Sequence, residues 1–263
     1  MKSITSRDNP AVKHLHGLAH NARDRRKAGE TLFDGPHLIG AALDAGWPLK
    51  RLVVSESGYA RAEIRSLLER APATIPALKL DDSLVAHVSP VDTPTGILAV
   101  ADIPPAAPAP AAGASLVVLD GVQDPGNLGT ILRTAAAAGV EDVVLTGGCA
   151  QPWSPRTLRA GMGAHFHLRI HECTDLAGLL ATYPGAVLAT ALDARAKSLY
   201  ETDLRGPVAW LFGAEGQGLS EAAKALATGT VLIPMAAGIE SLNVAAAAAV
   251  CLFEQRRQRA ARG

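Results

Sequence analysis

The stretch Ile233-Pro-Met-Ala-Ala-Gly-Ile-Glu-Ser-Leu-Asn-Val244 joins a short apolar segment to a long alanine-rich one. The apolar segment is typical of a buried strand, and the alanine-rich segment is typical of a helix. Glu240, Ser241 and Asn243 lie where the predicted helix begins. Serine and asparagine have a structural interpretation there, because their side-chain oxygens accept the free backbone N–H groups of the first turn. A functional interpretation is equally open, and other parts of the chain bear on it.

Two further junctions repeat the order of strand, polar glycine loop and helix, namely 123-QDPGNLGTILR-133 and 211-LFGAEGQGLS-220. The strands in this half are short and almost wholly apolar (LVVL, VVLT, VAWLF, TVLI), which predicts a parallel sheet covered by helices on both faces. We therefore expect a doubly wound α/β layer in which three loops form one site. The predicted strands are 116–119, 143–146, 165–170, 186–191, 208–212 and 230–233, and the predicted helices are 128–138, 155–161, 175–182, 219–227 and 242–259.

The chain divides at residues 102–114, DIPPAAPAPAAGA, where repeated prolines and small residues predict a semi-rigid linker. We place an N-terminal α/β domain at 1–101 and a C-terminal domain at 115–263. The N-terminal domain is expected to contain helices 10–28, 36–45 and 60–70 and strands 31–33, 51–54, 75–80 and 97–100.

The three junctions resemble, in order and spacing, the motifs of the SpoU, or TrmH-like, family of RNA ribose 2′-O-methyltransferases. The resemblance runs from about Leu116 to Phe253. It implies a trefoil-knotted α/β fold, S-adenosylmethionine as cofactor and a homodimer. Periodicity alone gives no reason to expect a knot. The segments ITSRDNPAVKHLHGLA, LFDGPHLIGAALDAG and TPTGILAV are similar to an RNA-recognition domain of the ribosomal protein L30e type, although Asp34 and Thr95 replace the usual Glu and Gln.

The resemblance also implies which residues form the site. The expected catalytic residues are Asn127, Arg133, Glu215, Ser241 and Asn243. The expected cofactor-binding residues are Gly213, Ala214, Ile233, Met235 and Leu242. The expected RNA-binding residues are Arg7, Asn9, Lys13, Arg156 and Arg159.

Methylation of a ribose hydroxyl requires orientation of the partners and removal of one proton, with no metal or covalent nucleophile. Arginine is a poor base because its pKa lies above about 12. We therefore expect Arg133 to reach back to the Asn127 loop and to stabilise the developing alkoxide or hold a phosphate, with the proton leaving through phosphate or water. Asn127 and Ser241 could instead be helix caps, and Glu215 could fix its loop by accepting backbone N–H groups.

Composition sets the outer limits of these interpretations. The formal net charge is zero, which by itself disfavours a nucleic-acid-binding protein, but the first thirty residues are rich in Lys, Arg and His. The basic side chains of this segment would attract phosphate, or the segment is an ordinary solvated helix. The three cysteines lack a CxxC pair, and neither a signal core nor a membrane span is found, so we expect a soluble cytoplasmic protein without disulfides.

A metal site is a weak alternative, because 165-HFHLRI-170 alternates as a strand and its histidines should face outward. The leading hypothesis is therefore a methyltransferase acting on ribosomal RNA. Transfer RNA is the alternative substrate, and a non-catalytic RNA-binding or ribosome-assembly protein is the alternative class. A nicotinamide-dependent oxidoreductase lacks support, since Gly213, Gly216 and Gly218 do not have GxGxxG spacing.

Overall fold

The computed structural model describes residues 1–91, 93–111, 113–190, 196–239 and 241–261. The chain forms two compact units. The first comprises Met1–Pro105 together with Gln151–Phe166, and the second comprises Ala106–Ala150 and His167–Gly263. Segment 151–166, which the sequence-based division placed in the C-terminal domain, therefore packs with the N-terminal residues.

The first unit is built on a mixed sheet. Its strands, in spatial order, are β1 (Lys2–Ile4), β4 (Ala77–Leu80), β3 (Leu49–Ser55), β5 (Ile97–Asp102) and β2 (Glu30–Asp34). β1 and β3 run parallel to β4, whereas β5 is antiparallel to β3 and β2. Side chains alternate along β3, so that Val53 joins one buried cluster while Leu52 and Val54 join another. The sheet is therefore covered on both faces.

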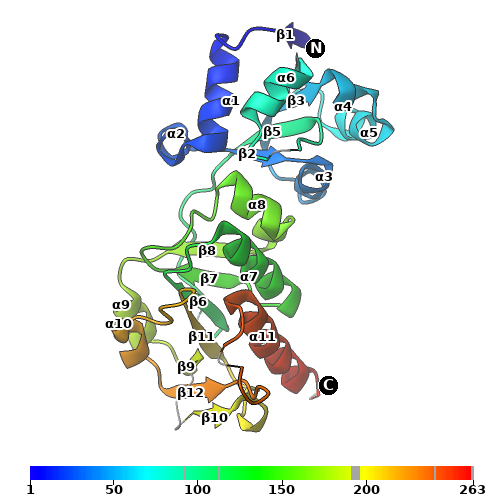
Figure 1. Cartoon of the computed structure of the whole chain (residues 1–263). Helices are drawn as coiled ribbons and strands as arrows, with labels where there is room; N and C mark the ends of the chain where they lie inside the picture. The colour runs from blue at the N-terminus through cyan, green and yellow to red at the C-terminus, as the bar shows by residue number, and fades with distance from the viewer. Residues whose placement is uncertain (92, 112, 191–195, 240, 262–263) are drawn as a thin grey trace. The chain divides into compact units, whose positions relative to one another are not determined.

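Helices of the first unit pack on this sheet (Figure 1). They are α1 (Pro10–His20), α2 (Ala22–Ala28), α3 (Pro36–Asp44), α4 (Glu56–Ala60), α5 (Ala62–Arg70), α6 (Asp82–Val88) and α8 (Pro155–Gly161). Leu158 of α8 is fully buried in the cluster that contains Phe33 and Leu52. That burial explains why segment 151–166 belongs to this unit.

The single helix predicted over 10–28 was wrong. Asn21 has φ −121° and ψ 115°, which is extended backbone, and it separates α1 from α2. Its side-chain oxygen accepts hydrogen bonds from the backbone N–H groups of Arg23 and Asp24. Asn21 is thus the N-cap of a second helix, an arrangement that asparagine favours over a place in a helix interior.

The second unit confirms the predicted parallel sheet. Its strands, in spatial order, are β10 (Lys197–Ser198), β12 (Gly229–Leu232), β9 (Ala186–Thr190), β11 (Val208–Gly213), β6 (Leu116–Asp120), β7 (Asp142–Leu145) and β8 (Arg169–Glu172). Every pair of neighbours in the described residues is parallel. The knot implied by the resemblance stays a prediction.

Helices cover the two faces of this sheet (Figure 1). They are α7 (Pro125–Ala138), α9 (Leu176–Ala181), α10 (Glu221–Ala225) and α11 (Val244–Ala260). Leu211 of β11 packs in a cluster with Leu180 of α9 and Ala223 of α10. The next side chain back along the strand, Trp210, points to the other face, where its Nε1 donates to Gln255 of α11. α7 and α11 lie side by side on that face.

The strand predicted over 165–170 was also wrong. Ala164–His167 form a short 3-10 helix, and β8 begins only at Arg169. His165 does not face outward: it is 1% exposed, its Nε2 lies 2.9 Å from the Pro152 carbonyl oxygen, and burial lowers its pKa to about 4. Phe166 packs with Phe33 in the first unit, so this stretch leaves the second sheet.

His171 lies on β8, where its Nε2 is 2.9 Å from the Asp142 carboxylate. Among the described residues, no group of three His, Cys, Asp or Glu side chains is placed to hold a metal ion. A search of the same residues finds no helix long and apolar enough to cross a bilayer.

Candidate functional site

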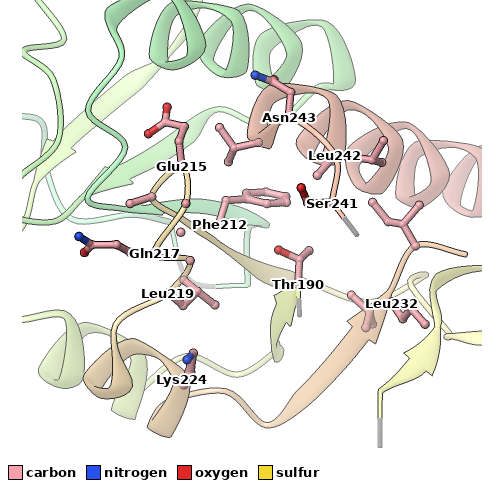
Figure 2. A pocket seen from close by; sticks show the side chains of 18 of the residues that line it. Thr190, Phe212, Glu215, Gln217, Leu219, Lys224, Leu232, Ser241, Leu242 and Asn243 are labelled. Atoms are coloured by element: carbon pink, nitrogen blue, oxygen red, sulfur yellow. The ribbon is translucent and has the colours of Figure 1, made fainter. Parts of the chain in front are cut away.

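The three junctions meet at the carboxyl edge of the parallel sheet. β6 and β11 are neighbours and end in register, with Gly213 opposite Asp120. The loops after β11 and β12 border a cavity of about 650 Å³, and the start of α11 closes another side of it. In Figure 2, Glu215 and Asn243 lie at one end of the cavity, Phe212 and Thr190 lie in its middle, and Lys224 lies at the opposite end.

The loop after β11 folds back on itself at Gly213. Ala214 and Gly218 exchange two backbone hydrogen bonds, with N···O distances of 3.0 and 2.9 Å. Gly216 and Gly218 have φ of +88° and +71°, a region that favours glycine. A Cβ on Gly213 would lie 2.1 Å from both the Gly218 carbonyl carbon and the Leu219 nitrogen. The close return of the loop, which presents Glu215 at its tip, therefore requires glycine at 213.

Glu215, Asn127 and Asn243 form a chain of hydrogen bonds that joins all three junctions. Asn127 Nδ2 donates to Glu215 Oε1 at 2.8 Å, and Asn243 Nδ2 donates to Asn127 Oδ1 at 2.9 Å. Asn243 Oδ1 in turn accepts from the backbone N–H groups of Ala245 and Ala246. Residues 88 and 116 positions apart in the sequence thus become neighbours.

The direction of this chain is fixed at both ends. An ionised carboxylate only accepts hydrogen bonds, and a backbone N–H only donates them. The Asn127 amide must therefore present its nitrogen to Glu215 and its oxygen to Asn243. The Asn243 amide must present its oxygen to the helix start and its nitrogen to Asn127. Both amides are held in one orientation, which is what the positioning of a substrate needs.

Glu215 is the anionic end of the chain. Burial works to raise the pKa of its carboxyl, but the hydrogen bonds from Asn127 Nδ2 and from the loop backbone, including Gln123 N at 3.3 Å, outweigh it. The pKa therefore lies below its ordinary value, so the group is ionised at neutral pH. The prediction that Glu215 accepts backbone N–H groups and fixes its loop agrees with these contacts.

The helix caps differ from those predicted. Asp124, not Asn127, is the N-cap of α7, since its carboxylate accepts from the Asn127 N–H at 2.7 Å. Asn243, not Ser241, is the N-cap of α11. Pro125 fits the first position of α7 because its missing N–H is not needed there. The helix therefore begins three residues earlier than predicted, which leaves the Asn127 side chain free to contact Glu215.

Asp120, which the sequence analysis missed, ties the strand ends together. Its carboxylate accepts from the Ser220 N–H at 2.7 Å and from the Thr146 hydroxyl at 2.8 Å. Burial works to raise its pKa, but these hydrogen bonds lower it below its ordinary value. The loops after β6, β7 and β11 thus share one half-buried anchor at the edge of the site.

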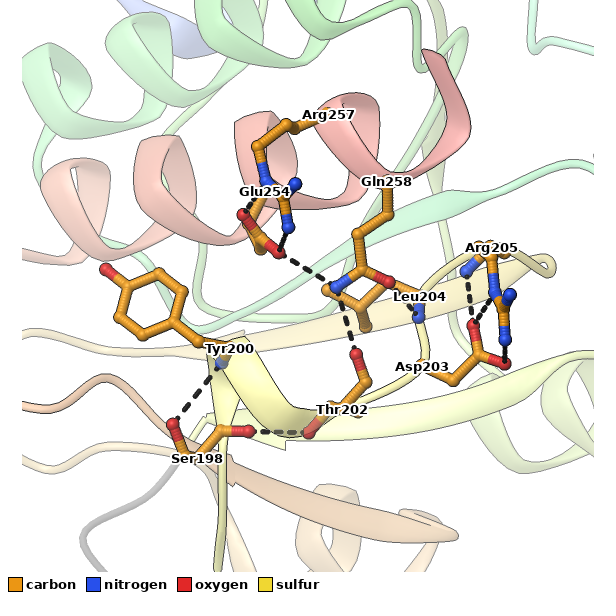
Figure 3. A network of polar contacts seen from close by, with 9 residues as sticks. All are labelled: Ser198, Tyr200, Thr202, Asp203, Leu204, Arg205, Glu254, Arg257 and Gln258. Atoms are coloured by element: carbon orange, nitrogen blue, oxygen red, sulfur yellow. Dashed lines mark hydrogen bonds and ion pairs between the residues drawn. The ribbon is translucent and has the colours of Figure 1, made fainter. Parts of the chain in front are cut away.

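The far end of α11 is anchored by a polar network (Figure 3). Gln258 accepts from the Leu204 N–H at 2.9 Å and donates to the Thr202 carbonyl at 3.0 Å. It also donates to Glu254, which accepts from Arg257. Together with the bond between Trp210 and Gln255, these contacts fix the helix of which Asn243 is the N-cap.

All five predicted cofactor-binding residues line the cavity. These are Gly213, Ala214, Ile233, Met235 and Leu242. Ser241 lines it as well, whereas Glu240 falls outside the described residues. Sequence reasoning missed other wall residues. Phe212, Gln217 and Leu219 lie within the quoted 211–220 junction but were not singled out, and no motif marked Thr190 or Lys224.

Arg133 is not brought to this cavity. It is exposed on α7, and no hydrogen bond or ion pair joins it to another described residue. The expected reach back to Asn127 is wrong for a single chain, because a side chain six positions later on a helix points about 120° away. The position of Arg133 is on the outward side of α7.

The predicted RNA-binding residues all lie in the first unit. Arg7 is exposed, Lys13 pairs with Asp8 at 3.0 Å, and Asn9 is the N-cap of α1. Arg156 and Arg159 of α8 line a second, more open cavity of about 410 Å³ with Pro90, Val91 and Ala160.

Asp34, one of the two departures noted in the sequence, is buried beside that second cavity. Its carboxylate accepts from the Ser89 hydroxyl at 2.6 Å and lies 3.4 Å from Arg159 Nη1. Burial raises the pKa of Asp34, although Ser89 and Arg159 oppose that effect. Asp34 of β2 therefore restrains the side chain of Arg159 on α8.

Comparisons with known proteins agree with this architecture. Residues 114–253 match the model of the SpoU rRNA Methylase family, and residues 9–99 match the MRM3-like substrate binding domain. An uncharacterised tRNA/rRNA methyltransferase of Synechocystis is 37% identical, over 97% of this chain and 94% of that protein. The 23S rRNA (guanosine(2553)-2′-O)-methyltransferase RlmP of Bacillus subtilis is 33% identical, over 97% of this chain and 100% of the relative.

Among solved structures, an AdoMet-bound rRNA methyltransferase from Sinorhizobium meliloti superposes with a TM-score of 0.84 at 31% identity, covering 97% of each chain. The family model spans more than half of the sequence and includes all three junctions that the hydrogen bonds of Asn127 join. The chain therefore belongs to the SpoU rRNA methylase family.

Proposed function

We propose that this protein transfers a methyl group from S-adenosylmethionine to a ribose 2′-hydroxyl of ribosomal RNA. The observation that carries the proposal is that the loops after β11 and β12 line one cavity, and that the hydrogen bonds of Asn127 to Glu215 and Asn243 join the 123–133 junction to them. Family membership and the rRNA methyltransferases among the relatives support the same reaction.

The cavity residues fit this cofactor. A volume of about 650 Å³ lies within the range of about 300–1,000 Å³ that suits a molecule of this size. The walls combine apolar side chains with main chain left open at Gly216 and Gly218, where a Cβ would meet nothing within 4 Å, so both an aromatic ring and polar groups would find partners. Gly213, Ala214, Ile233, Met235 and Leu242 would hold the cofactor. When bound, S-adenosylmethionine supplies a methyl group on a positively charged sulfur.

The polar chain would position the RNA. Asn127 and Asn243 each use one amide N–H in the described contacts, so each retains a second N–H donor on a side chain that cannot flip. These donors would hold the ribose and its phosphate while the hydroxyl attacks. With its oxygens already accepting hydrogen bonds and its pKa lowered, Glu215 orients this chain, and the hydroxyl proton leaves through phosphate or water.

We also propose that the protein is a homodimer and that Arg133 acts in the site of the second copy. Arg133 lies on the outward side of α7. Phe253, a large apolar side chain that is 47% exposed, lies on the neighbouring α11. A second copy would cover Phe253 and give Arg133 the anionic partner that the described residues of its own chain do not provide. Light scattering should give twice the chain mass for the wild type and a smaller mass for Phe253→Glu.

The reaction is tested directly with ribosomal RNA isolated from cells that lack the gene. The RNA is incubated with the purified protein and S-adenosylmethionine labelled with tritium in the methyl group, then digested to nucleosides. Label in one 2′-O-methyl nucleoside is expected, and the Asn127→Ala variant should give much less. Label on a base, or label only in transfer RNA, would contradict the proposed substrate group.

A further inference from the structure

Three histidine rings contact one another on the surface of the first unit. His16 and His20 lie on α1 and His87 lies on α6. The ring centroid of His16 is 4.6 Å from that of His20 and 4.5 Å from that of His87. The His16 and His87 planes meet at 22° and are stacked, whereas the His16 and His20 planes are tilted by 47°. His20 is exposed, and the other two rings are half-buried. Together the rings form a continuous aromatic surface, here called the histidine surface.

The charged neighbours of the histidine surface are basic. Burial lowers the pKa of His20 most, followed by the charge of His16, with Arg156 a further cationic neighbour. Burial likewise lowers the pKa of His87, followed by the charges of His16 and Arg7. Within the described part of the chain, no carboxylate contributes to either shift. Near neutral pH the His20 and His87 rings are therefore uncharged, and Arg156 and Arg7 are their cationic neighbours.

Uncharged flat rings flanked by cations match the chemistry of an unpaired nucleic-acid strand. Bases stack on aromatic rings whatever their sequence, and arginines pair with the phosphates between them. An acidic peptide would satisfy the arginines but would leave the rings without a flat partner. Arg156 also lines the open cavity of about 410 Å³, so the surface continues into a hollow beside Arg159.

We propose that the histidine surface, with Arg7 and Arg156 as its cationic neighbours, binds an unpaired segment of the RNA substrate through base stacking on the imidazole rings. This inference rests on the proposed function, because it presupposes that the protein acts on RNA. It assigns to His16, His20 and His87 a role in substrate binding that is separate from the methyl-transfer cavity. A strand held there would select RNA with an accessible single-stranded region over continuous duplex.

The test uses the full chain and a fluorescein-labelled single-stranded RNA of twelve nucleotides, with affinity measured by fluorescence anisotropy. His20→Ala is expected to raise Kd by at least about fivefold, the lower end of the effect of losing one stacked base. His20→Phe retains a flat ring and should bind within about twofold of the wild type. His37→Ala is the matched control, since His37 is an exposed histidine on α3 with no described polar contact.

Several results would overturn the inference. One is that His20→Ala and His37→Ala bind the RNA with equal Kd. Another is that His20→Phe binds as weakly as His20→Ala. A third is that the wild type binds the single strand and its duplex with equal affinity. A titration with S-adenosylmethionine on the same samples separates this inference from the proposed function. Loss of cofactor binding by the wild type would count against the function, whereas normal cofactor binding with unchanged RNA affinity in His20→Ala would count against the histidine surface alone.

Discussion

Gly213→Ala tests whether the folded-back loop forms the cofactor site. The added Cβ would lie 2.1 Å from the Gly218 carbonyl carbon and from the Leu219 nitrogen, whereas real Cβ contacts are essentially never under 3.0 Å. The loop must therefore move by about 0.9 Å, the difference between those two distances. Both obstructing atoms belong to the backbone, so no side-chain rotation relieves the clash.

The expected magnitude follows from that clash. Overpacking of this kind costs about 1–3 kcal/mol. If the loop shifts while the sheet stays in place, most of this free energy is lost from cofactor binding. The Kd for S-adenosylmethionine should then rise about 5- to 150-fold. Movement of the loop would also displace Glu215 from Asn127 and so disturb the polar chain.

Isothermal titration calorimetry with S-adenosylmethionine measures the effect, and thermal unfolding shows whether the fold survives. Gly147→Ala is the matched control, because a Cβ there meets nothing within 4 Å and the backbone has no positive φ. The control should bind like the wild type. If Gly213→Ala also bound the cofactor with wild-type affinity, the loop would not form the binding site as described.

Other predictions concern turnover, pH and the core. Arg133→Lys should keep much of the RNA affinity but lose most of the turnover in single-turnover assays, because a lysine cannot donate in the same bidentate geometry; near wild-type turnover would defeat the proposed role. His165 has a folded pKa of about 4 against an ordinary 6.5, so its contribution to stability is complete above about pH 6.5 and is lost as pH falls toward 4. The difference between the two pKa values, at about 1.36 kcal/mol per pH unit, corresponds to about 3 kcal/mol of unfolding free energy. Urea titrations at several pH values should show that this part of the pH dependence disappears in His165→Phe. Gln255→Leu leaves the buried Trp210 N–H without an acceptor and should lower the free energy of unfolding by about 1–3 kcal/mol in urea; a change below about 0.5 kcal/mol would contradict the account of that contact.

The sheet of the second unit could be predicted because its information is local. Short apolar runs such as 116–119 and 208–212 can be buried on both faces only within a parallel sheet with helices on both sides. The polar glycine loops after them mark the strand ends. Such local signals locate each loop, and the topology then brings the loops to one edge.

The contacts within the site could not be predicted in the same way. Several side chains near each helix start could serve as the cap, and the structure uses Asp124 and Asn243. Asp124 had a readable signal, since Pro125 follows it at the first helical position. The pairing of Asn127 with Glu215 depends on a separation of 88 residues and has no local signature.

Segment 151–166 shows the limit of a division based on composition. Its helix 155–161 was predicted correctly, but the sheet on which that helix packs depends on the partners that bury Leu158. The linker at 102–114 indicated one crossing between units, whereas the chain crosses again near 151 and 167. The inward position of His165 follows from the same excursion.

The central claim is tested most directly by mapping 2′-O-methyl groups across the ribosomal RNA of cells with and without the gene. The account predicts that one ribose methyl mark is absent without the gene, returns with the wild-type gene and does not return with Asn127→Ala. An unchanged set of ribose methyl groups in cells that lack the gene would contradict it.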